Sequence, residues 1–321
     1  MNNKKNLLKI IAMKNSYQKQ FLLFLLFLPL VGFGQQQAMF TQYMFNTPAI
    51  NPAYAASFTV PTVTFLAREQ WVGFEGAPST QTFSIHTPFR PEKIGIGISA
   101  INDKIGPIKE SAVFFDFAYQ IKVSQNANLS FGAKGGFSMF RASFSEMNTV
   151  QQNDIAFQQD INGRFLPNFG FGCYYYTKKF YIGASVPKLL QNEISINNDI
   201  YTGSANKEER HYFLVGGYLF DINQNVKFKP SFQTKFVNGS PIGIDLTANF
   251  LLKEKFWVAP NLRVGESVGI ILQGIFGNMK VGYAYDFPFN EIGEYTTGSH
   301  EILLSFDLIF NDLRVKSPRY F

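Results

Sequence analysis

Three neighbouring residues near the end of the chain, Ser299, His300 and Glu301, have the types that hydrolases use for nucleophilic catalysis. In such a site the histidine takes the hydroxyl proton and the carboxylate orients the imidazole, so the three side chains must converge in space. Adjacent residues of a strand point to opposite faces, and the surrounding pattern predicts a strand here. Ser299 and His300 should therefore diverge, and the chain has only two other histidines, His86 and His211. We expect no catalytic residues, and we assign structural roles to His300 and Glu301.

A second candidate for chemistry is the hexapeptide NDKIGP, from Asn102 to Pro107. Asn102 and Asp103 offer two adjacent oxygen ligands, whereas a Ca²⁺ loop needs its ligands spaced along the loop. Asn, Asp, Gly and Pro each favour reverse turns through their own backbone preferences, so we predict a turn. The single cysteine, Cys173, excludes an internal disulfide. We therefore expect neither a metal site nor a cofactor.

Alternation of apolar and polar residues is the dominant pattern of the remaining chain. In VKFKPSFQTKF, residues 226–236, one alternate set is rich in phenylalanine and the other in lysine. A period of two predicts a strand with one apolar and one polar face. About fourteen such segments occur, with approximate cores at 59–68, 79–87, 93–102, 111–122, 128–140, 168–177, 179–187, 210–221, 225–237, 241–251, 255–264, 267–276, 279–287 and 299–310.

The connections between these segments alternate in length. Every second one is short, whereas the others are often long, at 69–78, 103–110, 141–167, 188–209 and 288–298. Outer-membrane barrels have short periplasmic turns, longer outer loops and an even number of strands. Most segments hold about ten residues, the length that crosses a bilayer when tilted. The sequence therefore predicts an all-β fold, a transmembrane outer-membrane β-barrel of about fourteen antiparallel strands.

A soluble β-sandwich would alternate too, but its outer faces would be polar. Here aromatic residues make up 17% of the chain, the apolar face is dense in Phe, Ile and Leu, and the polar face carries charges of both signs. This combination favours a lipid-facing wall around a hydrated lumen. We place Asp103, Asp286, His300 and Glu301 on the lumen side. An aromatic girdle at the periplasmic interface is expected from Tyr174, Tyr175, Tyr176 and Trp257, which lie near short turns.

The first 34 residues have the order of a secretory signal peptide, with scattered lysines, the apolar run FLLFLLFLPLV, and glycines at 32 and 34. The alternative is a membrane anchor, but this run is shorter than the roughly 20 residues that span a bilayer. We predict cleavage after about Gly34, with translation starting at Met1 or Met13. The predicted organisation is a signal peptide at 1–34, a plug at 35–57, a barrel at 58–310 and a periplasmic tail at 311–321.

The predicted mature chain opens on an irregular stretch, TQYMFNTPAINPAYAAS, at residues 41–57. Such backbone cannot lie in lipid with unpaired polar groups, but it can lie inside a barrel, where side chains and water satisfy it. We expect a plug or hatch segment; the alternative is a periplasmic arm that binds another protein. The residues expected to carry its contacts are Gln42, Tyr43, Phe45, Asn46, Asn51, Pro52 and Tyr54.

The motif REQWVG opens the first long outer loop and contains Arg68, Gln70, Trp71 and Gly73. Arginine and tryptophan are the residue types that anchor protein interfaces, so this rim is a candidate docking surface. The alternatives are a lumen charge for Arg68 and an interfacial girdle position for Trp71.

Eight motifs occur in an order that resembles the PorP/SprF family of Bacteroidota outer-membrane proteins, from about Ala38 to Phe321. They are FTQYMFNTPAINPAYAAS, REQWVGFEGAPSTQTFSIHTPF, INDKIGP, PNFGFGCYYYTKKFYIGASVPKLL, RHYFLVGGYLF, GYAYDF, GSHEILLSF and SPRYF. The chain departs from the family pattern at Ala56, where glycine is expected, and at Glu69, where glutamine is expected.

The resemblance implies a non-enzymatic role in type IX secretion and gliding motility. Family members assist export or surface retention of large, adhesin-like proteins with a C-terminal sorting domain, often of type B. Periplasmic or lipoprotein components of the machinery are further expected partners, together with outer-membrane lipid, whereas nucleic acid is not. The alternative is a plugged channel for small hydrophobic molecules, in which Pro230 or Pro260 would kink a strand and open the wall laterally.

Overall fold

The computed structural model of the protein describes residues 39–89, 93–146, 160–194 and 207–309. The predicted signal peptide, its cleavage site and the predicted tail at 311–321 lie outside the described residues. No helix within the described ranges is long and apolar enough to cross a membrane.

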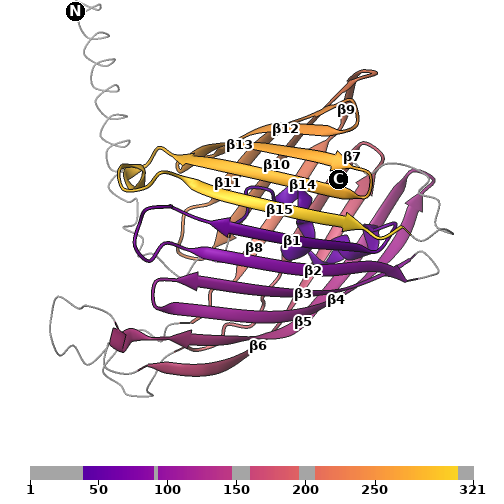
Figure 1. The fold of residues 1–321 in the computed structure, drawn as a ribbon. Coiled ribbons are helices and arrows are strands. Elements are labelled where there is room, and N and C mark those ends of the chain that lie inside the picture. The colour runs from indigo at the N-terminus through magenta and orange to yellow at the C-terminus, as the bar shows by residue number, and fades with distance from the viewer. Residues whose placement is uncertain (1–38, 90–92, 147–159, 195–206, 310–321) are drawn as a thin grey trace, which may run out of the picture. The chain divides into compact units, whose positions relative to one another are not determined.

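The described strands form one antiparallel sheet of fifteen strands that curls around a central space (Figure 1). The strands are β1 (Thr62–Glu69), β2 (Ser79–Phe89), β3 (Ile94–Ile105), β4 (Ile108–Ser124), β5 (Ala127–Ala142), β6 (Ile161–Thr177), β7 (Phe180–Val186), β8 (His211–Tyr218), β9 (Phe220–Asn223), β10 (Val226–Val237), β11 (Gly243–Leu252), β12 (Phe256–Arg263), β13 (Ser267–Phe276), β14 (Met279–Pro288) and β15 (Ser299–Asp307).

Two pairings close the sheet into a barrel. The last strand, β15, pairs with the first, β1, and β10 pairs with β11. Both β8 and β9 pair with β10, so they are two halves of one wall strand that is interrupted at Leu219. The wall therefore has fourteen strands, and the predicted fourteen-stranded antiparallel barrel is confirmed.

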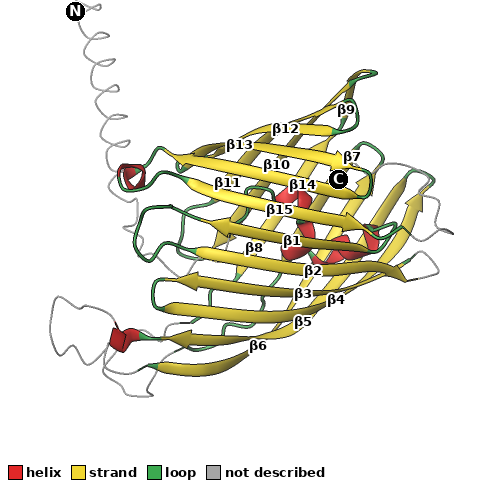
Figure 2. Cartoon of the chain, viewed as in Figure 1, coloured by secondary structure: helices red, strands yellow, loops and turns green. Residues whose placement is uncertain are grey.

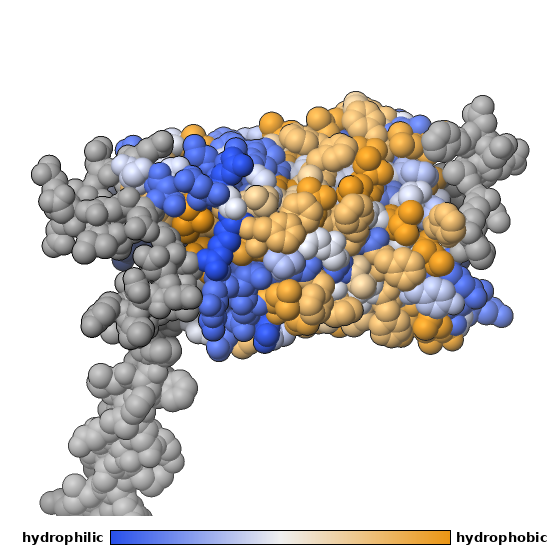
Figure 3. Space-filling model, turned by 90° about the horizontal axis from the view of Figure 1, so that it is seen from below, coloured by the Kyte–Doolittle hydropathy of each residue, from blue (hydrophilic) through white to orange (hydrophobic). Residues whose placement is uncertain are grey.

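Alternation sorts the side chains onto two faces of the wall. On β4, the exposed residues Phe115, Phe117 and Tyr119 point outward, while Asp116 between them is buried. Figure 3 shows hydrophobic residues over the middle and one end of this side of the barrel, and a hydrophilic band at the end with the β3–β4 turn. An apolar outer band around a charged interior is the arrangement that a bilayer requires of a barrel.

Three neighbouring strands are longer than the roughly ten residues predicted for each segment. β4 and β6 have 17 residues each, and β5 has 16. The outward face of β4 begins with Lys109 and Ser111 and becomes apolar only from Val113. The outer ends of these strands therefore extend the wall beyond its apolar band, a feature that the ten-residue rule for membrane crossing does not include.

The predicted long loop at 103–110 is wrong for the same reason. β3 continues to Ile105 and β4 begins at Ile108, so the turn consists of Gly106 and Pro107 alone. Gly106 has φ +54°, in the left-handed region that glycine tolerates, and proline has no N–H to donate. The predicted loop at 141–167 is likewise shorter, because β6 starts at Ile161.

The chain before β1 lies inside the ring of strands, where Figure 2 shows short helices surrounded by the wall. We call residues 40–57 the lumenal segment. It contains three 3-10 helices, η1 (Tyr43–Phe45), η2 (Thr47–Ala49) and η3 (Pro52–Ser57), and most of its residues are buried. The Asn51 side chain accepts from Ala53 N at 3.0 Å and caps η3, while prolines at 48 and 52 set the local backbone angles.

Candidate functional site

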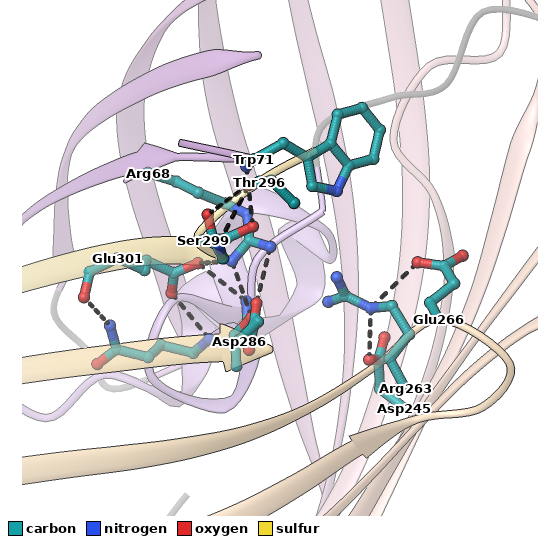
Figure 4. A network of polar contacts seen from close by, with 12 residues as sticks. Arg68, Trp71, Asp245, Arg263, Glu266, Asp286, Thr296, Ser299 and Glu301 are labelled. Atoms are coloured by element: carbon teal, nitrogen blue, oxygen red, sulfur yellow. Dashed lines mark hydrogen bonds and ion pairs between the residues drawn. The ribbon is translucent and has the colours of Figure 1, made fainter. Parts of the chain in front are cut away.

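A buried polar cluster holds the start of the lumenal segment against the wall. Strand pairing places Arg68 of β1 opposite Glu301 of β15. The Arg68 guanidinium donates to Glu301 at 3.1 Å and to Asp286 of β14 at 2.8 Å. The Glu301 carboxylate also accepts two backbone N–H groups, from Thr41 at 2.9 Å and from Gln42 at 2.8 Å. One glutamate therefore joins the wall to the lumenal segment (Figure 4).

Thr41 completes the cluster through its hydroxyl group. This hydroxyl accepts from Arg68 at 2.8 Å and donates to Asp286 at 2.5 Å. The side chains of Arg68, Asp286 and Glu301 are at most 3% exposed. Buried charges are costly unless paired and hydrogen-bonded, and here two carboxylates share one guanidinium and two backbone donors. The lumenal segment therefore supplies some of the hydrogen bonds that offset the cost of burying these charges.

A second buried ion pair continues the row of charges along the wall. Arg263 of β12 lies opposite Asp245 of β11, with Nε–Oδ1 at 2.8 Å, and approaches Glu266 at 3.9 Å. Read across β11, β12, β14, β15 and β1, the buried charges are Asp245, Arg263, Asp286, Glu301 and Arg68, and each arginine is paired with at least one of the carboxylates. Paired buried charges are tolerated because each partner offsets the cost of burying the other.

A further buried cluster, on β2, β4 and β5, was missed by sequence reasoning. His86 of β2 lies 3.0 Å from Asp116 of β4, and Lys134 of β5 lies 3.1 Å from the other oxygen of Asp116. Lys134 also donates to the carbonyl of Pro48 at 3.3 Å, and the His86 ring stacks on Phe58 at 5.4 Å. The sequence shows a polar or charged residue at an inward position of each of these strands. It does not show that the three residues contact one another, because they lie on different strands.

Glycines on the inner wall give η3 the space to approach. A Cβ atom at Gly95 of β3 would lie 2.2 Å from Ala55 O, and one at Gly132 of β5 would lie 2.2 Å from Ala53 N. No other residue fits at such a close approach of two backbones. Asn51 adds a hydrogen bond from its amide to the carbonyl of Cys173 at 3.0 Å.

Aromatic residues of the lumenal segment pack on the remaining wall. Phe45 lies 6.0 Å from Trp257, and the Lys229 ammonium sits over both rings, 4.8 Å from Trp257 and 5.6 Å from Phe45. Tyr54 packs edge-on against Tyr174 at 5.2 Å. The predicted girdle positions of Trp257 and Tyr174 are therefore wrong, because both side chains point inward and are buried against the segment.

Two further side-chain hydrogen bonds join the lumenal segment to the wall. Tyr43 OH donates to Ser231 Oγ at 3.4 Å, and the Asn46 amide donates to Thr82 Oγ1 at 3.4 Å. Among the residues predicted to carry the contacts of this segment, Asn51 is 1% exposed and Pro52 is buried. A blocking function for the segment stays a prediction.

The REQWVG motif divides between the lumen and the outer rim. Arg68 points into the lumen, while Gln70 donates its N–H to Pro78 O at 2.9 Å within the loop. Trp71, with φ +51°, donates its N–H to Ser299 Oγ at 3.1 Å, and Gly73 has φ +98°. The first outer loop is therefore tied to the start of β15, directly beside the buried cluster.

Of the predicted lumen residues, Asp103 faces inward and accepts from Thr80 at 2.5 Å. The lumen position predicted for His300 is wrong. His300 lies between the inward-facing Ser299 and Glu301, so alternation turns it outward, where its Nδ1 is 2.7 Å from Tyr283 OH. Within the described residues, no three His, Cys, Asp or Glu side chains are grouped to hold a metal ion.

The chain after β7 is bonded to two strands of the wall, β6 and β4. Leu189 N donates to Phe169 O at 2.8 Å, and Lys188 forms ion pairs with Glu110 of β4 and Glu208. Burial lowers the pKa of Lys188, but the charges of Glu110 and Glu208 outweigh it and leave that pKa raised. Lys188 is therefore charged at neutral pH and fixes this segment to the wall.

A closed antiparallel barrel with an apolar outer band, a charged lumen and an internal N-terminal segment defines an outer-membrane β-barrel protein. The family model described as type IX secretion system membrane protein PorP/SprF matches residues 32–306. The match spans most of the chain, which therefore belongs to the PorP/SprF family. A search of curated proteins finds no match.

Several solved barrels are similar in fold at low identity. Omp33 of Acinetobacter baumannii is 8% identical with a TM-score of 0.47, covering 78% of this chain and 98% of its own. The Ralstonia pickettii toluene transporter TbuX is 10% identical with a TM-score of 0.46, covering 88% and 99%. A Pseudomonas aeruginosa FadL homologue is 10% identical with a TM-score of 0.44, covering 80% and 92%. These likenesses are too distant to bear on function.

Proposed function

We propose that this barrel assists the export, binding or surface retention of a large, adhesin-like protein that carries a C-terminal sorting domain. Membership of the type IX secretion family supports this role. In this proposal the protein has no catalytic function, and periplasmic or lipoprotein components of the secretion and gliding machinery are its further partners.

The observation that carries the proposal is the seating of residues 40–57 in the lumen. The segment is bonded on one side to Glu301 and Asp286 and on the other to Lys134 and the carbonyl of Cys173. A large protein cannot pass a lumen that is filled in this way. The barrel would therefore act as a plugged docking platform, and its partner would engage the outer loops.

Co-isolation tests this proposal. The barrel, carrying an affinity tag in a turn on the periplasmic side, is cross-linked in intact cells and purified from outer membranes. We expect an exported protein with a sorting domain to be recovered in near-stoichiometric amount. Recovery of periplasmic or inner-membrane proteins alone would contradict the docking role.

A channel for small hydrophobic molecules is the second candidate, and two gaps in the wall favour it. The β10 register puts Pro230 opposite Tyr218, where β8 ends and the strand is interrupted. In the β11–β12 ladder, the pair between Ala248 and Pro260 is missing. Because Pro230 pairs with Ala248, the two prolines flank one residue of β11 at the same level, and each lacks an N–H donor.

Uptake of a radiolabelled long-chain fatty acid distinguishes this candidate. A channel would lose uptake when the gene is deleted and would be impaired by Pro230→Ala, which restores a donor to the wall. Unchanged uptake in both strains would exclude the channel and leave the docking role intact.

A further inference from the structure

Two outer loops form a single unit on one side of the barrel mouth. The loop after β1 and the loop before β15 are joined by Val72 N to Gly298 O at 2.8 Å and by Thr297 N to Val72 O at 2.9 Å. The hydroxyl of Thr296 donates to Val72 O at 3.0 Å as well. Trp71 ties this unit to Ser299 and therefore to the strand that bears Glu301. In Figure 1, both loops lie at the same end of the barrel.

This unit displays apolar side chains that nothing in the described chain covers. Val72 is 37% exposed, Phe74 is 45% exposed and Tyr295 is 67% exposed. The hydrogen bonds just described hold the three residues on one short stretch of rim. Grouped and exposed apolar side chains with a polar border mark interaction sites more often than isolated ones do.

The border of these apolar residues is acidic. Residues 69–79, 264–267 and 289–299 contain no lysine or arginine, whereas they contain the exposed residues Glu69, Glu75, Glu266, Glu291 and Glu294. The next part of the rim is basic, because exposed Lys104, Lys109 and Arg141 lie on the outer ends of β3, β4 and β5, and the β3–β4 turn contacts the first loop through Gly106 N and Gly76 O at 2.9 Å. We call Val72, Phe74 and Tyr295 with these five glutamates the acidic rim patch.

We propose that the acidic rim patch docks a polypeptide segment of the exported partner that presents lysine or arginine beside apolar side chains. This inference rests on the proposed function and adds the surface and the chemistry of recognition. Phe74 and Tyr295 supply rigid aromatic contact area, which anchors protein interfaces. The glutamates steer a cationic segment toward the patch and disfavour acidic ones.

Charge argues for a polypeptide and against lipid as the occupant. Phosphate-bearing headgroups carry negative charge, so the glutamates around the patch would repel a headgroup that came into contact with it. On the lipid-facing wall, Phe115 of β4 pairs with Ile98 and Gly135 and has Val113 and Phe117 beside it on the same face, so its border is apolar. The patch therefore differs in charge from the surface that contacts the bilayer.

Site-specific photo-cross-linking in intact cells tests this inference. p-Benzoylphenylalanine replaces Phe74 in the full-length barrel, and adducts are identified by mass spectrometry. We expect adducts to a basic, apolar segment of an exported protein. The combined changes Glu75→Lys, Glu291→Lys and Glu294→Lys should lower the adduct yield about tenfold, the size expected for losing several favourable charge contacts.

The matched control is the same photoreactive residue at Arg141, which is exposed at the outer end of β5, with β3 and β4 between it and β2. It should not give the same adduct, and Arg141→Glu should leave the Phe74 adduct unchanged. Adducts to lipopolysaccharide only, or a polypeptide adduct that is insensitive to the glutamate changes, would overturn the inference. Co-isolation of an exported protein with no adduct at Phe74 would overturn the patch alone, whereas failed co-isolation would overturn the proposed function.

Discussion

At the scale of single residues, Glu301 connects three parts of the molecule that are far apart in sequence. Its carboxylate binds Arg68 of β1 and the backbone of Thr41 and Gln42, while its own strand begins at the rim that Trp71 contacts. A charge-assisted bond to a backbone N–H is stronger than a neutral one. Glu301 therefore supplies charge-assisted hydrogen bonds that hold the start of the lumenal segment against the wall.

Replacing Glu301 with alanine should destabilise the barrel and release the start of the segment. The change leaves Arg68 with one carboxylate and leaves two buried N–H groups without an acceptor, for which we expect a loss of about 3 kcal/mol. Urea unfolding of barrels folded in lipid vesicles measures this loss. His300→Ala on the same strand is the control, because its side chain points outward, and equal losses in the two variants would contradict the account.

Two glycines on β5 allow the position of the lumenal segment to be tested apart from the stability of the strand. Gly132→Val places a side chain where Ala53 N lies, whereas Gly135→Val meets no heavy atom within 4 Å. Valine favours strands, so both variants should form the barrel, and only Gly132→Val should displace the segment.

Labelling of a cysteine reports this displacement. Ser57→Cys in a Cys173→Ser background places a thiol in the segment, where Ser57 is 4% exposed. A membrane-impermeant maleimide should react with it several-fold faster in the Gly132→Val barrel than in the Gly135→Val barrel. Identical reaction rates in the two variants would show that Gly132 does not determine the position of the lumenal segment.

At the scale of elements, proline explains why one wall strand is split into β8 and β9. Leu219, at the break, donates its N–H to Lys179 O at 2.7 Å on the β7 side, so Tyr218 and Phe220 turn their backbone groups toward β10. Opposite Tyr218 stands Pro230, which cannot donate to it. The interruption therefore follows from the lack of one donor rather than from the sequence of β8 itself.

Pro230→Ala should join β8 and β9 into one regular strand. The added N–H can donate to the facing carbonyl of Tyr218, for which we expect a gain of about 1 kcal/mol. Hydrogen exchange followed by mass spectrometry should show slower exchange over residues 217–221. Pro61→Ala, outside any strand, is the control, and unchanged exchange in Pro230→Ala would contradict the assigned cause of the break.

At the scale of the whole molecule, alternation was sufficient to predict the barrel. The period of two along 226–236 reports directly which face of the wall each residue occupies. The alternation did not predict the full length of the strands that extend past the apolar band. The outward face of β4 is polar at Ser111, although this residue still belongs to the strand. The sequence prediction also misplaced His300 and Trp257, because residue type was given more weight than position in the alternation.

The contacts of the candidate site could be predicted only in part. The polar, irregular composition of residues 41–57 indicated an enclosed segment, and Arg68, Asp286 and Glu301 were recognised singly. Their mutual contacts depend on barrel closure, which brings together residues separated by 233 positions. Registers between strands that are distant in sequence are not encoded in local pattern, so the cluster of His86, Asp116 and Lys134 was missed.

In the proposed function, the barrel serves one exported surface protein. Quantitative proteomics of the cell surface and the medium, comparing a clean deletion with the same strain carrying the wild-type gene, tests it most directly. The account predicts that one large protein with a sorting domain is lost from the surface on deletion and restored with the gene. An unchanged surface proteome would contradict it.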